Sequence, residues 1–133
     1  MSSYTIHTTV NRPFDAAVGA VRAALEDQGF GVLTEIDLKA TLKEKLDVDI
    51  EPQIILGACR PPLAYDAIRA EPSIAAVLPC NVVVRSTDQD TTVVEAFDPD
   101  AMMGLADNET LHGVAADAKR RLNAVFAALN EEN

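Results

Sequence analysis

The chain is organised around residues 54–84, which open with Ile54-Ile-Leu-Gly-Ala-Cys-Arg-Pro-Pro62 and close with Val77-Leu-Pro-Cys-Asn-Val-Val-Val84. Both cysteines of the sequence lie in this stretch: Cys59 ends the first apolar run and Cys80 begins the second. Each run is too short for a helix and rich in β-branched residues, which is typical of strands buried on both faces. We therefore predict two core strands, each with a cysteine at one end.

A short helix is predicted between these two strands. Pro61 and Pro62 can begin a helix, where the missing N–H is not needed, and Pro72 ends it. The strand pairing then decides whether the cysteines meet. Antiparallel strands bring the end of one beside the start of the next, whereas a right-handed crossover between parallel strands places Cys59 and Cys80 at opposite ends. The sequence leaves both arrangements open.

The N-terminal part of the chain predicts two strands and two helices. Residues 5–10 alternate weakly and indicate a strand, and apolar residues at helical spacing follow from Phe14 to Leu25. Gly29 can supply the left-handed residue that ends this helix. Residues 30–36 indicate the next strand, and Asp37 can cap a short helix after it.

The C-terminal part predicts a hairpin and a long helix. The turn cluster Asp88-Gln-Asp90 joins two strands, and the second of them runs from Thr91 to Phe97. Residues 101–106 are expected to be a connector, and an apolar stripe indicates a helix over about 108–129. The prediction is one α+β domain, residues 1–133, in the order β-α-β-α-β-α-β-β-α, with an antiparallel or mixed β-sheet covered by helices.

The composition argues against two classes of partner. Eleven basic residues against 21 acidic ones give a net charge of −10, whereas nucleic acid and anionic membrane surfaces both reward clustered Lys and Arg. The first residues, Met1 to Thr5, have neither a basic segment nor an apolar one, and no apolar run approaches the roughly 20 residues of a membrane span. We expect a cytoplasmic protein whose cysteines are thiols.

Four segments of the chain resemble a known family. They are residues 34–46, 54–64, 78–84 and 98–103, and the paired Gly-Ala-Cys and Leu-Pro-Cys-Asn words are the most specific part of the likeness. The chain is thereby identified as a member of the bacterial and archaeal family named domain of unknown function 302. The resemblance implies a compact α+β domain that associates as a dimer, and it implies no activity. Family members commonly carry Asn after the first cysteine, where this chain has Arg60.

The two cysteines are the centre of the candidate site. Thiolates bind soft metals and attack disulfides, so Cys59 and Cys80 could form a ligand-binding or thiol site if they meet. The structural alternative is that both are buried as small hydrophobic residues. Polar residues that could complete the site, or could instead serve as backbone caps and surface ion pairs, are Arg60, Asn81, Asp98, Glu35 and Lys45.

Three functions are compatible with these residues. We prefer a non-catalytic protein that binds a small molecule or acts as an accessory domain, with its site near the cysteines. The first alternative is a thiol-based redox protein, or one that handles sulfur or a soft metal, using Cys59 and Cys80. The second is a homodimeric interaction scaffold. We expect no cofactor and no metal centre, since the cysteine spacing does not suit a structural zinc site and leaves Cys59 and Cys80 as weak metal candidates only.

Overall fold

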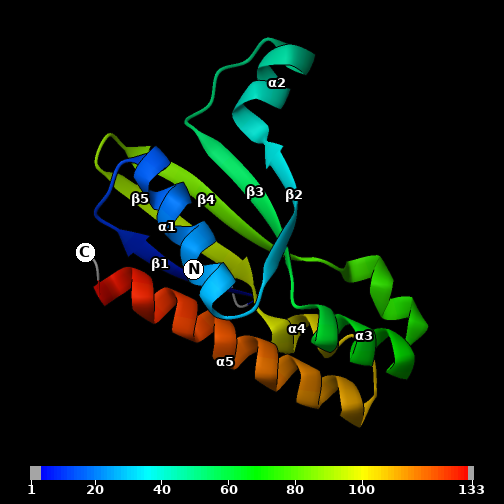
Figure 1. Ribbon diagram of the computed structural model, residues 1–133. Helices are drawn as coiled ribbons and strands as arrows, with labels where there is room; N and C mark the ends of the chain where they lie inside the picture. Colours follow the sequence, from blue (N-terminus) through cyan, green and yellow to red (C-terminus); the bar gives the residue numbers. More distant parts are fainter. Residues whose placement is uncertain (1–3, 132–133) are drawn as a thin grey trace.

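The five strands form one sheet in which every neighbouring pair is antiparallel. The computed structural model describes residues 4–131, and Figure 1 shows their arrangement. The spatial order of the strands is β1-β5-β4-β3-β2. Their bounds are β1 Thr5–Val10, β2 Gly31–Asp37, β3 Gln53–Cys59, β4 Cys80–Asp88 and β5 Thr91–Phe97. Of the two predicted possibilities, an antiparallel or a mixed sheet, the structure has the antiparallel one.

Five α-helices and one short 3₁₀ helix complete the described part of the chain. Their bounds are α1 Phe14–Asp27, α2 Leu38–Leu46, α3 Pro61–Ala70, η1 Pro72–Val77, α4 Pro99–Met103 and α5 Glu109–Glu131. The predicted α+β order is confirmed, with one correction at α4, where a connector was expected. This helix forms because the Asp98 side chain accepts a hydrogen bond from the Asp100 amide, and Pro99 occupies the first helical position, where no N–H is needed.

Helices α1 and α5 cover one face of the sheet (Figure 1). Strands β1 and β2 lie at opposite edges, so α1, which connects them, crosses the sheet. Its predicted end is confirmed, since Gly29 has a φ of +83°. The main core lies between this face and the two helices, and its fully buried residues include Val21, Leu56, Val84 and Leu122.

The prediction that β3 and β4 are buried on both faces is wrong. Val82 and Val84 are fully buried, whereas Val83 between them is partly exposed, and Ile55 of β3 is likewise partly exposed. The opposite face of the sheet carries polar groups: Arg85 Nη1 lies 2.9 Å from Glu95 Oε1. Helices therefore cover one face, and alternate residues of each strand face away from them.

A second cluster of buried residues closes one end of the sheet, where α3, η1, α4 and the first half of α5 meet. It contains Ala67 of α3, Met102 of α4 and Leu111 of α5, all fully buried, together with Cys80. Helix α5 thus contacts the sheet with its second half and α3 with its first half (Figure 1). This end of the sheet is where the two cysteines lie.

Helix α2 projects from the other end of the sheet as an arm (Figure 1). The predicted cap is confirmed, because Asp37 Oδ1 accepts a hydrogen bond from the Ala40 amide at 2.9 Å. No residue of α2 is buried, and the connection after it is held by Lys39 Nζ, which donates to the Ile50 carbonyl at 2.6 Å. The arm exposes large apolar side chains, with Leu46 65% and Val48 42% exposed.

Candidate functional site

The two cysteines lie side by side at one corner of the sheet. Strands β3 and β4 pair so that Ala58 is opposite Cys80, which places Cys59 directly beyond this pair. Both cysteines line the same pocket, and both are free thiols. The antiparallel pairing, one of the two arrangements that the sequence left open, thus brings them together.

The corner pocket, as we name the cavity at Cys59 and Cys80, is small. Its volume is about 30 Å³, which is enough for one or two water-sized groups. Its walls come from β3, the start of β4, α3 and α5, and the residues used below are Cys59, Cys80, Arg60, Leu63 and Ala64. The pocket can therefore take the tip of a molecule, while the rest of that molecule would lie at its mouth.

A glycine lets the wall of the pocket form. A side chain at Gly57 would come within 2.9 Å of Pro79 Cγ and would also meet Thr34 Oγ1. Strand β3 can therefore lie close against the Leu78–Pro79 segment only because position 57 has no Cβ. This approach holds the segment before Cys80 beside the end of β3.

The protonation of the thiols argues against a reactive pair. Burial raises the pKa of Cys59. Burial, and then the neighbouring Cys59 charge, raises the pKa of Cys80 to about 11. Since the thiolate is the nucleophile and the metal ligand, both groups are neutral and weakly reactive near pH 7. The cysteines are better suited to contact a ligand than to attack one.

Arg60 brings an unusual group to the pocket wall. It precedes α3, lines the corner pocket, and its Nε atom is buried with no hydrogen-bond partner in the described part of the chain. The side chain lies over Gly29, where an added Cβ would be 3.2 Å from Arg60 Nε. A buried N–H without an acceptor costs about 1–3 kcal/mol, so a water or a ligand oxygen is expected to accept from this donor.

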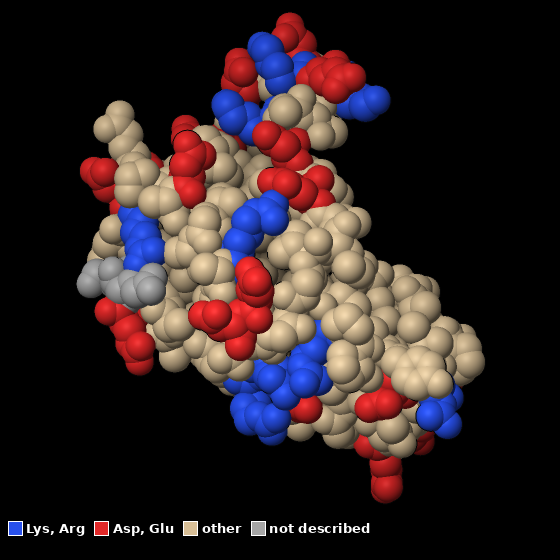
Figure 2. All heavy atoms as spheres, viewed as in Figure 1, with Lys and Arg blue, Asp and Glu red and all other residues tan. Residues whose placement is uncertain are grey.

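A cluster of arginines surrounds Asp117 of α5 next to Arg60. Asp117 Oδ1 lies 2.7 Å from Arg121 Nε and 2.9 Å from Arg120 Nη2, and Arg121 Nη1 donates to the Gln28 carbonyl at 3.3 Å. Burial alone would raise the pKa of Asp117, but the Arg121 hydrogen bond and the charges of Arg121, Arg120 and Arg60 hold it below its ordinary value. Figure 2 shows basic side chains gathered over the middle of α5.

The remaining predicted candidates do not line the corner pocket. Asn81 lies opposite Gly57 in the β3–β4 pair and is exposed. Glu35 of β2 forms an ion pair with Arg22 of α1 at 2.8 Å, on the covered side of the sheet. Lys45 lies on the exposed α2 arm, away from the two cysteines.

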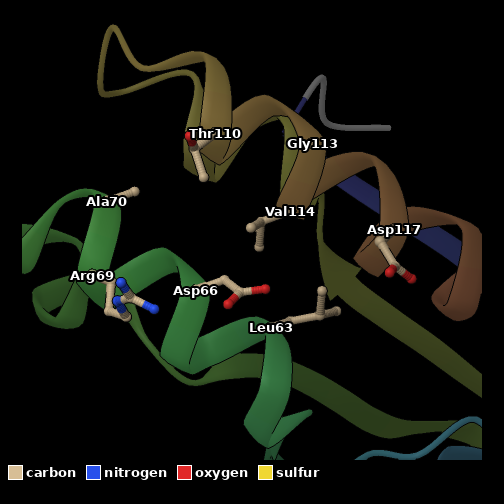
Figure 3. A pocket seen from close by; sticks show the side chains of 8 residues that line it. All are labelled: Leu63, Asp66, Arg69, Ala70, Thr110, Gly113, Val114 and Asp117. Atoms are coloured by element: carbon tan, nitrogen blue, oxygen red, sulfur yellow. The ribbon is translucent and has the colours of Figure 1, made fainter.

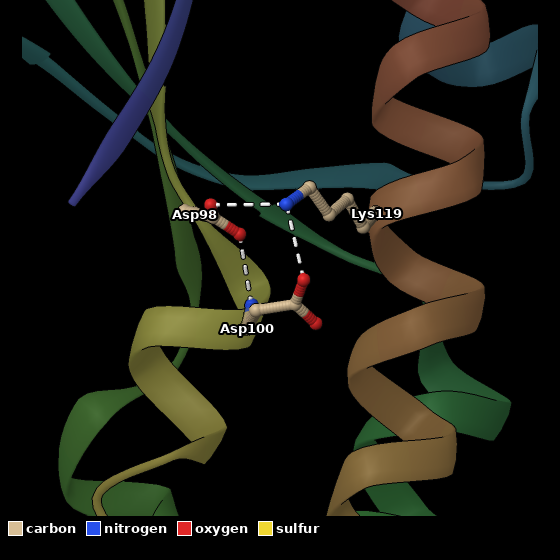
Figure 4. Close-up of polar contacts among 3 residues, drawn as sticks. All are labelled: Asp98, Asp100 and Lys119. Carbon is tan, nitrogen blue, oxygen red and sulfur yellow. Dashed lines mark hydrogen bonds and ion pairs between the residues drawn. The ribbon is translucent and has the colours of Figure 1, made fainter. Parts of the chain in front are cut away.

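Asp98 has a structural role in the helix after β5. One of its oxygens accepts from the Asp100 amide at 2.9 Å, and the other lies 3.1 Å from Lys119 Nζ, which also lies 3.0 Å from Asp100 (Figure 4). The hydrogen bonds that Lys119 donates to Asp100 and Asp98 raise the pKa of Lys119. Asp98 therefore ties the end of the sheet to α5.

A wider groove continues from the corner pocket between α3 and α5. Its volume is about 520 Å³, and Leu63 lines both this groove and the corner pocket. Figure 3 shows Leu63 and Asp66 of α3 and Val114 of α5 pointing into the space between the helices. A ligand whose tip enters the corner pocket could extend over Leu63 into this groove.

Within residues 4–131, no group of three or more His, Cys, Asp or Glu side chains could hold a metal ion. Over the same residues, no helix is both long enough and apolar enough to cross a membrane.

Comparisons with known proteins agree with the fold. Residues 6–129 match the family described as a domain of unknown function, DUF302. The chain is also similar to the crystal structure of an uncharacterized conserved protein DUF302 from Bacillus stearothermophilus, with 26% sequence identity and a TM-score of 0.87. That match covers 96% of this chain and 98% of the other. No curated protein matches the chain.

Proposed function

We propose that this chain, which belongs to the family described as domain of unknown function DUF302, binds a small molecule at the corner pocket of Cys59 and Cys80. The two thiols contact the ligand as uncharged, polarisable groups and take no part in a reaction, since burial raises the pKa of both. The protein would then act as a binding or accessory domain, and its role would depend on the molecule it holds.

The observation that carries this proposal is the unpaired Nε of Arg60. Buried donors in folded proteins nearly always have a partner, and one without a protein acceptor calls for a water, an ion or a ligand in that role. Arg60 lines the same pocket as both thiols. A ligand that supplies an acceptor to the Arg60 guanidinium and places a small group beside the cysteines would bind this charge and fill the cavity together.

The test combines thermal stability with protection of Cys59, which is more exposed than Cys80. Compounds of up to about ten heavy atoms are screened for a rise in melting temperature. Those that raise it are then tested for slower alkylation of Cys59 by iodoacetamide, followed by mass spectrometry. A ligand present at about 100 times its Kd stabilises the folded state by about 2.7 kcal/mol, which is readily measured for a domain of this size.

Two variants make the screen specific. Ala64→Leu fills the corner pocket from α3, and Ala16→Leu adds the same atoms at an exposed position of α1. We expect at least one compound to raise the melting temperature and protect Cys59 in the wild type and in Ala16→Leu, and to do neither in Ala64→Leu. The proposal is wrong if no compound gives both effects, or if Ala64→Leu responds as the wild type does.

A second candidate function is the binding of a soft metal ion by the two thiols. Its supporting observation is that both cysteines line the corner pocket, beside the Ala58–Cys80 pair of β3 and β4. The charge of Cys59 also raises the pKa of Cys80, as expected for thiolates that repel each other. A monovalent soft ion would displace both protons and offset this repulsion. Titration with Ag⁺, read by thiolate-to-metal absorbance, should then saturate at one ion per chain. Equal binding by Cys59→Ser and Cys80→Ser variants would exclude the shared site.

A third candidate is a homodimeric scaffold. Large apolar side chains are exposed along β2 and the α2 arm, with Leu33 64% and Ile36 44% exposed, and exposed apolar patches of this kind mark interaction surfaces. A dimer joined there should persist at micromolar concentration in light scattering and dissociate in a Leu33→Lys, Ile36→Lys double variant. A wild-type monomer under the same conditions would argue against this function.

A further inference from the structure

The start of α3 lies beside the corner pocket, which Arg60, Leu63 and Ala64 line. Helix α3 has ten residues, Pro61–Ala70, with no side-chain cap and no acidic residue in its first turn. Pro61 and Pro62 carry no N–H, so Leu63 has the first free amide of the helix, and Leu63 lines the pocket. The partial positive charge of this helix end is therefore not offset by the residues that usually occupy such a position.

Arginine side chains add full positive charges near the start of α3, although only Arg60 lines the pocket. Arg60 immediately precedes α3, and Arg120 and Arg121 of α5 share a single carboxylate, Asp117, whose pKa all three arginines lower. Three guanidinium groups around one carboxylate leave a positive excess, in a chain whose net charge is −10. Asp117 offsets only part of this charge, and the remaining positive charges repel one another.

The corner pocket limits the size of what these charges can hold. Its volume of about 30 Å³ admits a methyl, a thiol or a group of similar size between Cys59 and Cys80. A guanidinium donates two parallel hydrogen bonds that match the two oxygens of a carboxylate. The basic cluster is also confined to a few residues, whereas a nucleic acid needs an extended basic surface.

We propose that the ligand of the corner pocket is a small organic carboxylate with a short uncharged tail. The carboxylate lies against Arg60 and the start of α3, with Arg120 and Arg121 adding long-range attraction, and the tail enters between Cys59 and Cys80. This inference rests on the proposed function and adds the chemical class of the ligand. It also gives the Arg60 guanidinium a negatively charged partner at the pocket wall.

The experiment compares probes that differ in charge and share their shape. Propionate and mercaptoacetate carry a carboxylate and a short tail, and propionamide is the neutral counterpart of propionate. Binding is measured by titration calorimetry and by protection of Cys59 from iodoacetamide. We expect one or both carboxylates to bind at least tenfold more tightly than propionamide, and their affinity to fall as the salt concentration rises.

Arginine variants locate the charge that matters. Arg60→Gln should lose at least tenfold in carboxylate affinity, and Arg60→Lys should recover part of it, since lysine keeps the charge and lacks the paired donors. Arg120→Gln should lose about twofold to threefold, because its side chain is 71% exposed. Arg22→Gln is the matched control, an arginine paired with Glu35 away from the pocket, and should bind as the wild type does.

The outcomes separate the two proposals. If propionamide binds as tightly as propionate and protects Cys59, or if Arg60→Gln binds carboxylates as the wild type does, the ligand class is wrong and the pocket function stands. If neither carboxylate binds while neutral compounds of the screen still protect Cys59, the same conclusion holds. If no compound of either kind binds or protects, the proposed function fails as well.

Discussion

The main core and the corner pocket are built from the same strands, β3 and β4. Apolar packing accounts for the residues of the core and does not account for all the residues at the corner. In the main core, Leu56, Val84 and Leu122 are fully buried, and the buried hydroxyl of Thr92 in β5 has a partner, since it donates to the Arg12 carbonyl at 2.8 Å. At the corner, β3 and β4 carry two free thiols. Beside them lies the buried Nε of Arg60, from which no residue of the described chain accepts a hydrogen bond. Stability accounts for the first region, and the second contains groups that stability alone does not require.

The largest expected effect belongs to the main core. Leu122→Ala removes a fully buried side chain between α5 and the sheet and leaves a cavity. It should lower the free energy of unfolding by about 2–5 kcal/mol, as measured by urea denaturation. Carboxylate affinity at the corner, measured where the variant is still folded, should stay within twofold of the wild type. A large loss of carboxylate affinity with little loss of stability would show that the main core and the corner pocket are not independent.

Burial of Cys80 at the corner should make the stability of the protein fall at alkaline pH. The pKa of Cys80 is raised to about 11 in the folded protein from an ordinary value of 9.0, so the unfolded chain loses this proton first. The buried, protonated Cys80 thiol therefore contributes fully to the free energy of unfolding below pH 9. This contribution, on the order of 2–3 kcal/mol, is lost as the pH rises towards 11. Cys80→Ala should lack this loss in urea denaturation at pH 8, 9.5 and 11. An identical pH dependence in both proteins would contradict the burial of this thiol.

Gly57→Ala tests the close approach that shapes the corner. The added Cβ meets Thr34 Oγ1 and comes within 2.9 Å of Pro79 Cγ, so we expect a loss of about 1–3 kcal/mol in the free energy of unfolding. Gly113→Ala is the matched control, because a Cβ at this position of α5 has nothing within 4 Å. The control should gain roughly 0.5–1 kcal/mol, since alanine favours helix over glycine. Equal effects would mean that the approach at Gly57 is not tight.

The smallest expected losses of stability are those of variants at Asp98 and Glu35, two residues of the predicted site. Asp98→Ala removes the cap of α4 and the contact with Lys119, and should cost about 1 kcal/mol. Glu35→Gln removes an ion pair between half-exposed side chains and should change the free energy of unfolding by less than about 0.5 kcal/mol. Neither variant should alter carboxylate binding at the corner. A binding defect in either would extend the site beyond the pocket described above.

Much of the fold was predictable because local patterns determine it. The β4–β5 hairpin has a polar turn cluster at Asp88–Asp90, and Asp37 and Gly29 act at helix ends as their side chains and backbone preferences indicate. Two features escaped prediction for physical reasons. Consecutive valines at 82–84 hide the alternation that distinguishes one-sided burial, and the short helix at Pro99–Met103 has too few residues to show a helical period.

The candidate site was predictable only in part. The positions of the two cysteines at predicted strand ends indicated a candidate site. Whether the cysteines lie close together depends on the β3–β4 pairing, which no local sequence pattern determines. The arginine cluster could not be predicted, because Arg60 lies far along the chain from Arg120 and Arg121 and the packing of α3 against α5 brings them together. The one signal in the sequence was Arg60 itself, at a position where the family resemblance implies Asn.

The central claim is that Arg60 and the two cysteines hold one small carboxylate between them, and a crystal structure grown with mercaptoacetate tests it most directly. The account predicts density for the carboxylate on the Arg60 guanidinium and for the sulfur-bearing tail between Cys59 and Cys80. An empty corner pocket at a saturating concentration, or mercaptoacetate bound only in the wider groove between α3 and α5, would contradict it.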